Sequence, residues 1–186
     1  MPRLFTGLEL PADLRKRLEM LQSGFDTIRW VEPADFHITL RFIGDVPPST
    51  ADAICEALDS RTWPRPTVVP GELRTFGHAK PSSLYLAIRE DAALSRLAAG
   101  HDRLMQRLGL PADGRRFTPH ITLGRFRGGT RPEMVAQWLA ANGAPFALPF
   151  RPERFVLYSA RESTGGGPYR MEESWPLEEE TTTASQ

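Results

Sequence analysis

One tetrapeptide, His-Ile-Thr-Leu, occurs twice in this chain, at residues 37–40 and 120–123. Side chains alternate between the two faces of a β-strand, so each copy directs its histidine and threonine to one face and its isoleucine and leucine to the other. The Ile/Leu face suits a buried core. The His/Thr face carries a titratable ring and a hydroxyl about 7 Å apart, and it must then border a cleft or a second sheet. The repeat predicts two similar strands, each with one polar face.

The elements expected around the two copies follow the same order. The first half contains a strand at 3–10, a helix at 11–25, the first copy and a helix at 50–59. The second half contains a strand at 84–90, a helix at 91–108, the second copy and a helix at 131–141. Further strands are expected at 67–76, 146–148 and 154–160, and a last one ends at Trp175. This order predicts a duplicated α+β architecture, in which Phe5 and Tyr85 occupy corresponding positions.

Composition is that of an ordinary soluble domain. Hydrophobic residues make up 40% and charged residues 25% of the 186 residues, which suits one domain or two small lobes that share a core. No apolar run approaches the roughly 20 residues that a membrane span needs, and the N-terminus lacks the apolar core of a signal peptide. The single Cys55 cannot form an internal disulfide. We therefore expect a cytoplasmic protein that is a monomer and has no membrane partner.

The net charge of zero conceals an uneven distribution. Residues 111–170 contain nine arginines and four acidic residues, a net charge of +5, whereas residues 171–186 contain five glutamates and no basic residue, a net charge of −5. The basic segment is suited to attract phosphates, although a solvated surface explains the same charges. We expect residues 1–176 to form one bilobal domain and residues 177–186 to be a disordered tail.

Two such strands placed side by side would form a small concavity containing His37, Thr39, His120 and Thr122. Histidine titrates near 6.5, so one ring can be neutral while the other is protonated at cellular pH. Paired general base and general acid catalysis requires that combination. The threonine hydroxyls are uncharged donors suited to phosphate oxygens. Strict alternation directs Arg125 away from His120, but a β-bulge at Gly124 would turn it towards the same site.

Two other chemistries fit the pattern less well. A zinc site needs three or four ligands, and neither copy carries an Asp, Glu or Cys on its histidine face. A nucleophilic threonine needs an adjacent base and an oxyanion hole, and the duplication gives no reason for two nucleophiles. We therefore expect no metal and no cofactor.

The chain resembles the 2H phosphoesterases, which carry paired His-x-Thr-x motifs, and more narrowly the RNA 2′,3′-cyclic phosphodiesterases, once called 2′-5′ RNA ligases. The resemblance rests on RLFTGLELP, RWVEPADFHITLRFIGDV, RRFTPHITLGRFR and RFVLYSARESTGGGPYR, and it covers most of the sequence. It implies a bilobal α+β fold in which two antiparallel sheets face a central groove, with helices on the outside.

The resemblance also implies a reaction. The expected substrates are RNA with a 2′,3′-cyclic phosphate end and nucleoside 2′,3′-cyclic phosphates, hydrolysed to a 2′-phosphate and a free 3′-hydroxyl. By analogy His37 is the proton donor and His120 the proton acceptor, while Thr39, Thr122 and Arg125 bind the phosphate. The reverse reaction with an RNA 5′-hydroxyl would form a 2′-5′ bond.

Residues outside the repeated motifs have less certain roles. Four aromatic side chains are candidates for stacking on a base, although each residue type is more often part of a core: Trp30, Phe42, Phe117 and Tyr158. Arg151, Arg154 and Arg161 either follow RNA phosphates or lie on a solvated surface. We expect His78 and His101 to be ordinary surface residues.

Three functional hypotheses remain open from the sequence. The first is a metal-independent cyclic phosphodiesterase acting on RNA ends. The second is a non-catalytic RNA- or nucleotide-binding module, which would not need paired titratable rings. The third is a 2H enzyme for 2′-5′ oligoadenylate or a small cyclic nucleotide, which only the loops around the groove distinguish from the first.

Overall fold

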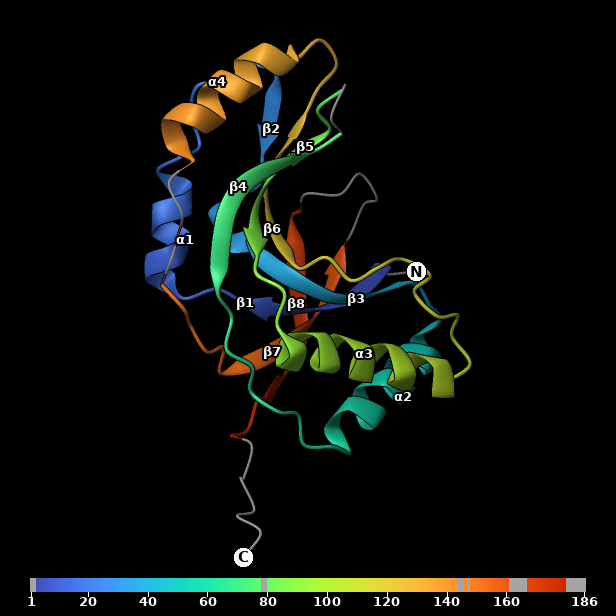
Figure 1. The fold of residues 1–186 in the computed structure, drawn as a ribbon. Coiled ribbons are helices and arrows are strands. Elements are labelled where there is room, and N and C mark those ends of the chain that lie inside the picture. The colour runs from blue at the N-terminus through green and yellow to red at the C-terminus, as the bar shows by residue number, and fades with distance from the viewer. Residues whose placement is uncertain (1–2, 78–79, 144–145, 147, 161–166, 180–186) are drawn as a thin grey trace, which may run out of the picture.

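The computed structural model describes residues 3–77, 80–143, 146, 148–160 and 167–179, and it contains two four-stranded sheets (Figure 1). The first sheet has the strand order β3 (His37–Asp45), β1 (Arg3–Glu9), β7 (Arg154–Ala160) and β8 (Tyr169–Pro176). The second has the order β2 (Ile28–Trp30), β6 (His120–Phe126), β5 (Ser83–Ile88) and β4 (Pro70–Phe76). Neighbouring strands are antiparallel throughout, which confirms the predicted α+β class with two antiparallel sheets.

The helices lie on the outside of the sheets. Two of them, α1 and α3, follow a strand of one sheet and pack on the other sheet. On the first sheet, α3 (Ala92–Arg107) contacts β3 and α2 (Pro48–Asp59) contacts β8. On the second sheet, α4 (Pro132–Asn142) contacts β4, and α1 (Ala12–Glu19) lies on the same side of that sheet (Figure 1). Thus α1, which follows β1 of the first sheet, covers the second sheet, and α3, which follows β5 of the second sheet, covers the first. A short 3-10 helix, η1 (Pro33–Asp35), precedes β3.

The two sheets share their internal order as well as their sequence motif. The order β3-β1-β7 in the first sheet corresponds to β6-β5-β4 in the second, with both tetrapeptides on the corresponding strands β3 and β6. The Ile/Leu faces are buried as predicted: Ile38, Ile121 and Leu123 are 0% exposed and Leu40 is 5% exposed. The histidines and threonines on the opposite faces are only half-buried. The hydrophobic effect therefore fixes which face of each strand remains for chemistry.

The last residue of each tetrapeptide is a β-bulge, an extra residue without a partner on the neighbouring strand. Thr39 and Arg41 lie opposite the consecutive residues Gly7 and Thr6, so Leu40 is a bulge residue in β3. The same relation makes Leu123 a bulge residue in β6, between Thr122 and Gly124. At Gly124 an added Cβ would lie 2.6 Å from the Ile28 Cδ1 atom, so a side chain there would collide with β2. The β-bulge expected in this strand is present, and its extra residue is Leu123, next to Gly124.

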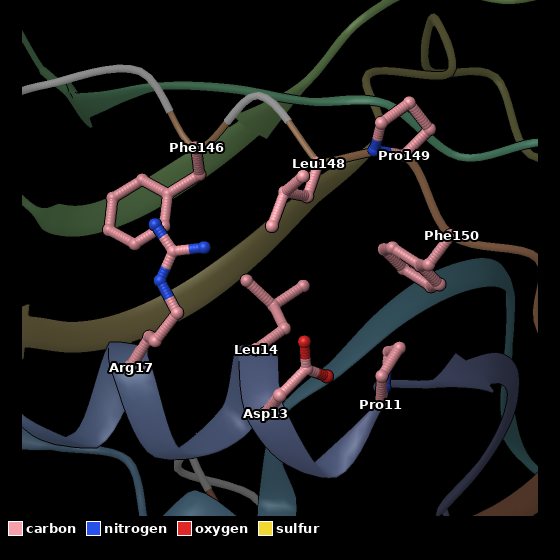
Figure 2. A pocket seen from close by; sticks show the side chains of 8 residues that line it. All are labelled: Pro11, Asp13, Leu14, Arg17, Phe146, Leu148, Pro149 and Phe150. Atoms are coloured by element: carbon pink, nitrogen blue, oxygen red, sulfur yellow. The ribbon is translucent and has the colours of Figure 1, made fainter.

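Two element boundaries differ from the prediction. The helix expected over 11–25 ends at Glu19, and Gly24 has a φ of 88°, outside the helical region. The strand expected at 146–148 is wrong, because neither Phe146 nor Leu148 lies in a strand, and residue 147 lies outside the described residues. This segment instead packs on α1, where the Arg17 guanidinium lies 5.0 Å from the Phe146 ring centre, next to Leu14 (Figure 2). Phe146 is thus buried against α1 and keeps one backbone hydrogen bond of 3.1 Å to the Gly71 carbonyl oxygen of β4, whereas Leu148 is exposed.

The C-terminal boundary of the packed chain also lies later than expected. Leu177 is buried, and the Glu178 amide donates a 2.8 Å hydrogen bond to the Trp63 carbonyl oxygen. The Glu179 carboxylate lies 2.6 Å from the Arg151 guanidinium. Residues 177–179 therefore belong to the folded body, and residues 180–186 of the predicted tail lie outside the described residues. None of the described helices is long and apolar enough to cross a lipid bilayer.

His101, expected at the surface, is fully buried in α3. Its ring centre lies 4.3 Å from that of Trp63 and 4.6 Å from that of Phe155, and its Nδ1 is 2.9 Å from the Thr6 hydroxyl. Burial lowers the pKa of His101 to about 3. A sequence signal was present, since His101 follows Leu94 and Leu97 at helical spacing on the buried face of α3. Its polar neighbours Gly100 and Asp102 obscured that spacing.

We expect His101 to make stability depend on pH. Its pKa is near 6.5 in an unfolded chain and about 3 when buried, so the unfolded state binds a proton more readily over that interval. The free energy of unfolding therefore falls as the pH is lowered, by about 2 kcal/mol at about pH 5 from this residue. Denaturant unfolding near pH 7.5 and near pH 5 measures how much the free energy of unfolding decreases between these pH values. This decrease should be about 2 kcal/mol smaller in His101→Gln than in the wild type. Equal losses in wild type and variant would contradict this expectation.

Candidate active site

The polar faces of β3 and β6 border a groove of about 590 Å³. Thr39 from β3 and Thr122, His120 and Arg125 from β6 line it together. His37 is half-buried beside this lining, with its Nε2 atom 3.1 Å from the Thr39 hydroxyl oxygen. The charge of His120 contributes to the pKa shift of His37, so the two rings lie within electrostatic range of each other. The groove thus brings together the motif residues of both halves.

Both imidazole rings are held in the same way. The Nδ1 of His37 lies 2.7 Å from the Asp35 carbonyl oxygen, and the Nδ1 of His120 lies 2.7 Å from the Thr118 carbonyl oxygen. A carbonyl oxygen can only accept, so each neutral ring carries its proton on Nδ1 and leaves Nε2 as the basic atom. For His37, this Nε2 then accepts the Thr39 hydroxyl hydrogen. Each ring therefore leaves Nε2 as the nitrogen that can take up a proton, and in His37 this atom faces its threonine.

Aromatic rings surround both histidines in a related arrangement. The Phe5 and Tyr158 ring centres lie 4.8 and 5.5 Å from that of His37, and the two rings stack on each other at 5.1 Å. In the second sheet, Tyr85 and Phe76 lie 5.3 and 5.1 Å from His120 and stack at 4.1 Å. These rings restrict the orientation of each imidazole and remove water from its side.

The segment leading into β8 adds a further contact on the His37 side. The Tyr169 ring lies edge-on to His37 at 5.1 Å, and its backbone amide donates a 3.1 Å hydrogen bond to the Asp35 carboxylate. Gly167, with a φ of 80°, lies so close to that carboxylate that a Cβ would overlap it. Asp35 therefore orients His37 through its carbonyl and positions Tyr169 through its side chain. Residues 163–166, which precede Gly167, lie outside the described residues.

Burial is the main cause of the lowered pKa of both histidines. It lowers the pKa of His37 to about 4, with the hydrogen bond to Asp35 opposing the shift and the charge of His120 adding to it. Burial also lowers the pKa of His120, opposed by the hydrogen bond to Thr118 and assisted by the positive charge of Arg125. Both rings are accordingly neutral near pH 7 in the free protein. A bound anion would favour their protonated forms.

The matched bulges give the groove two chemically different sides. Phe42 and Arg125 each follow their histidine by five residues, and both side chains line the groove. Arg125 is exposed, and no ion pair engages it within the described ranges. Phe42 is 43% exposed, with the Arg115 guanidinium 5.2 Å from its ring centre. One side is therefore cationic and the other aromatic.

The remaining predicted residues divide between groove and scaffold. Phe117 lines the groove, whereas Trp30 packs against the core beside Phe25. Tyr158 supports the His37 ring and is not among the lining residues of the groove. Arg151 and Arg154 pair with Glu179 and Glu9 at the surface, and Arg161 and His78 lie outside the described residues. Within the described part of the chain, no cluster of three or more His, Cys, Asp or Glu residues is arranged to hold a metal ion.

Several site residues were not predicted from the sequence. The rings of Phe76 and Tyr169 reach the histidines from strands whose pairing the sequence does not reveal. An ionic network at the groove wall, in which the buried Arg41 contacts Asp102 and Asp113 and the exposed Arg115 contacts Asp113, was also missed. Only the correspondence of Phe5 with Tyr85 in the repeat gave a signal, and it did not indicate contact with the histidines.

Comparison with known proteins supports the duplicated organisation. A family model described as LigT like Phosphoesterase matches the chain twice, at residues 8–85 and 86–169, and each match contains one copy of the tetrapeptide. Two solved structures below 25% identity share the fold. The crystal structure of E. coli LigT complexed with 3′-AMP has a TM-score of 0.74 and 24% identity, covering 95% of this chain and 99% of that one. TT0787 of Thermus thermophilus has a TM-score of 0.77 and 24% identity, covering 96% and 99%.

Three similar proteins carry the name RNA 2′,3′-cyclic phosphodiesterase. The one from Geobacillus stearothermophilus is 37% identical over 135 residues, or 69% of this chain but only 41% of the relative's own length. The one from Archaeoglobus fulgidus is 28% identical over 67% of this chain and 73% of the relative. The one from Bacillus subtilis is 25% identical over 84% of this chain and 87% of the relative.

We expect the charge of Arg125 to be detectable in the titration of His120. Replacing Arg125 with glutamine removes a positive neighbour, so the imidazolium becomes easier to form and the pKa of His120 should rise. Nuclear magnetic resonance titration of the histidine rings measures this shift, and the His37 ring should titrate near 4. Arg131→Gln, just before α4, is the matched control and should leave His120 unchanged. An unaltered pKa in Arg125→Gln would show that the two side chains do not interact.

Proposed function

Because the chain belongs to the LigT-like phosphoesterases, we propose that it is an RNA 2′,3′-cyclic phosphodiesterase. The substrate is a ribose 2′,3′-cyclic phosphate at an RNA 3′ end or in a free nucleotide, and the products are a 2′-phosphate and a 3′-hydroxyl. The observation that carries the proposal is one groove lined by Thr39, Thr122, His120 and Arg125, with His37 held next to Thr39 by the same kind of hydrogen bond that holds His120.

The proposed reaction is an in-line displacement at phosphorus. His120 Nε2 takes a proton from water while the water oxygen forms a bond to phosphorus. The bond between phosphorus and the ribose O3′ breaks, and the His37 imidazolium donates its Nε2 proton to that oxygen. The two histidines thereby exchange protonation states, and a proton transfer through solvent restores them. The cyclic ester is strained and already reactive, so the proposed reaction requires no metal or cofactor.

The assignment of His37 as the acid requires that it be protonated when the substrate is bound. Burial lowers its pKa to about 4 in the free protein, so a neutral ring predominates at pH 7. The phosphodiester carries a negative charge, and a nearby anion raises the pKa of an imidazole. We therefore infer that the substrate promotes protonation of the acid on which its cleavage depends.

The remaining groove residues bind the phosphate and the nucleoside. Thr39 and Thr122 donate to the non-bridging oxygens, and Arg125 offsets the charge that develops on them in the transition state. Phe42, with Arg115 beside its ring, provides a stacking surface for the base. Tyr158 acts on the substrate only through the His37 ring that it supports. The same site run in reverse, with an RNA 5′-hydroxyl as nucleophile, forms a 2′-5′ bond.

The proposed activity can be tested on the intact protein with 2′,3′-cyclic AMP and with an oligonucleotide ending in a cyclic phosphate. Turnover should persist in EDTA and give the 2′-phosphate isomer. His37→Ala and His120→Ala should each lower kcat by about 10²–10⁴-fold, the usual contribution of a general acid or base. His101→Gln replaces a buried histidine outside the groove and should retain activity.

Other outcomes would identify a different function. Binding of the nucleotide without any turnover would indicate a non-catalytic nucleotide-binding module. Turnover lost in EDTA would contradict metal independence. Faster cleavage of 2′-5′ oligoadenylate than of a cyclic phosphate would indicate a different 2H substrate.

The lowered histidine pKa values also predict the pH dependence of catalysis. The pH profile of kcat/KM reports the free enzyme, where the proton donor is lost as pH rises through its pKa. Burial holds both histidine pKa values below 6.5, so kcat/KM should already decline on the alkaline side of 6.5. The profile of kcat reports the bound complex and should decline at higher pH, because the substrate anion favours protonation. Rates at saturating and limiting 2′,3′-cyclic AMP give both profiles, and coincident alkaline limbs would contradict the expectation.

A further inference from the structure

Arg41 is a buried cation at the position where the second half of the chain has a glycine. Each follows the bulge residue of its strand, Leu40 for Arg41 and Leu123 for Gly124. In the second sheet, β2 lies along β6 at this position, and Ile28 fills the space beside Gly124. In the first sheet β3 has no second strand neighbour among the described residues. The Arg41 side chain, only 7% exposed, extends from this strand into the wall of the groove.

The Arg41 guanidinium connects three separate parts of the chain. Its Nε lies 2.6 Å from a carboxylate oxygen of Asp102 in α3, an ion pair without the alignment of a hydrogen bond. Its two terminal nitrogens donate to the carbonyl oxygens of Phe42 and of Pro111. A buried arginine has its greatest effect where several acceptors use its planar fork at once. Arg41 therefore joins β3, α3 and the segment that begins at Pro111.

The network continues along that segment to the aromatic side of the groove. The Asp113 amide donates a 3.0 Å hydrogen bond to Asp102, and the Asp113 carboxylate lies 3.9 Å from Arg41. Arg115 donates from its Nε to Asp113 at 3.1 Å and lies over the Phe42 ring. Burial disfavours the charged form of Asp113, but Arg115 and Arg41 outweigh it and lower its pKa. The contacts thus run from Arg41 through Asp113 and Arg115 to Phe42, whose carbonyl oxygen accepts a hydrogen bond from Arg41.

The backbone at His120 is held by β5 and not by this network. The Ile88 amide donates a 3.1 Å hydrogen bond to the Pro119 carbonyl oxygen, and β5 pairs Ala87 with His120. Loosening residues 111–117 would therefore displace Arg115 from Phe42 while β5 still holds the start of β6. The wall that would contact the base therefore depends on the Arg41 network, whereas the strand that carries His120 is held by β5.

We propose that Arg41 is a positioning residue for base recognition: it holds the segment 111–117 so that Arg115 and Phe42 form one rigid wall against the nucleoside base. The proposal rests on the proposed function, because it concerns the nucleoside end of the same substrate. Its consequence is that Arg41 acts on the binding of the base and not on the chemical step at phosphorus.

Arg41→Lys keeps the charge opposite Asp102 but loses the fork that reaches Pro111 and Phe42. Asp113→Asn keeps the shape but weakens the contacts with Arg41 and Arg115. Arg3→Lys alters an exposed ion pair with Asp45 at the other end of β3 and serves as the control. KM and kcat should be measured for 2′,3′-cyclic AMP and for 1-O-methylribose 2′,3′-cyclic phosphate, which has no base.

In Arg41→Lys and in Asp113→Asn, KM for 2′,3′-cyclic AMP should rise about tenfold more than KM for the baseless substrate, while kcat falls less than about threefold. Equal increases of KM on both substrates, a loss confined to kcat, or kinetic constants equal to those of Arg3→Lys would overturn the proposal. If Arg41→Lys does not fold, Asp113→Asn decides the outcome. Wild-type protein that hydrolyses neither substrate would instead contradict the proposed function itself.

Discussion

Each catalytic candidate is held by a hydrogen bond from its Nδ1 to the carbonyl oxygen two residues earlier, and the proposed chemistry depends on that bond. The bond is 2.7 Å long in both halves, at Asp35 for His37 and at Thr118 for His120. It selects the tautomer in which Nε2 is basic, and it limits rotation of the ring. Because both carbonyls lie where the chain enters a strand, the same backbone that builds the sheet also orients the base. Without this bond, the two rings would have no defined nitrogen to present to a phosphate.

Burial by aromatic rings is the second constraint, and it has a cost for catalysis. Phe5 and Tyr158 on one side, and Tyr85 and Phe76 on the other, hold the imidazoles in place but disfavour their charged forms. A site with both rings neutral contains a base but lacks an acid. In the proposed reaction an anionic substrate resolves this, because its charge favours protonation of the ring that must donate. Rigid orientation and substrate-dependent protonation therefore have the same structural origin.

The duplication is conserved in the backbone and altered in the side chains. Both strands have a bulge at the leucine of the tetrapeptide, so the fifth residue after each histidine faces the groove. That residue is Phe42 in one half and Arg125 in the other, which makes one side suited to a base and the other to a phosphate. The residue after the bulge is Arg41 in one half and Gly124 in the other, because only the second half has β2 beside it. Under the proposed function, a symmetric framework thus recognises an asymmetric molecule.

The repeated tetrapeptide by itself determined the two strands and their buried Ile/Leu faces, because alternation along a strand is a local property. The convergence of Thr39, Thr122 and His120 on one groove was predicted by assuming that the two strands lie side by side, and only the tertiary structure decided it. The bulge that turns Arg125 was also predictable from Gly124, since glycine permits the close approach of a neighbouring strand. The sequence misled at His101 and at 146–148, where the covering element is distant in the chain. Only the tertiary structure decided which rings surround the histidines, how far their pKa values fall, and that Arg41, Asp102 and Asp113 form one network. Those properties arise from contacts between residues far apart in sequence, whose energies depend on burial that no local pattern records.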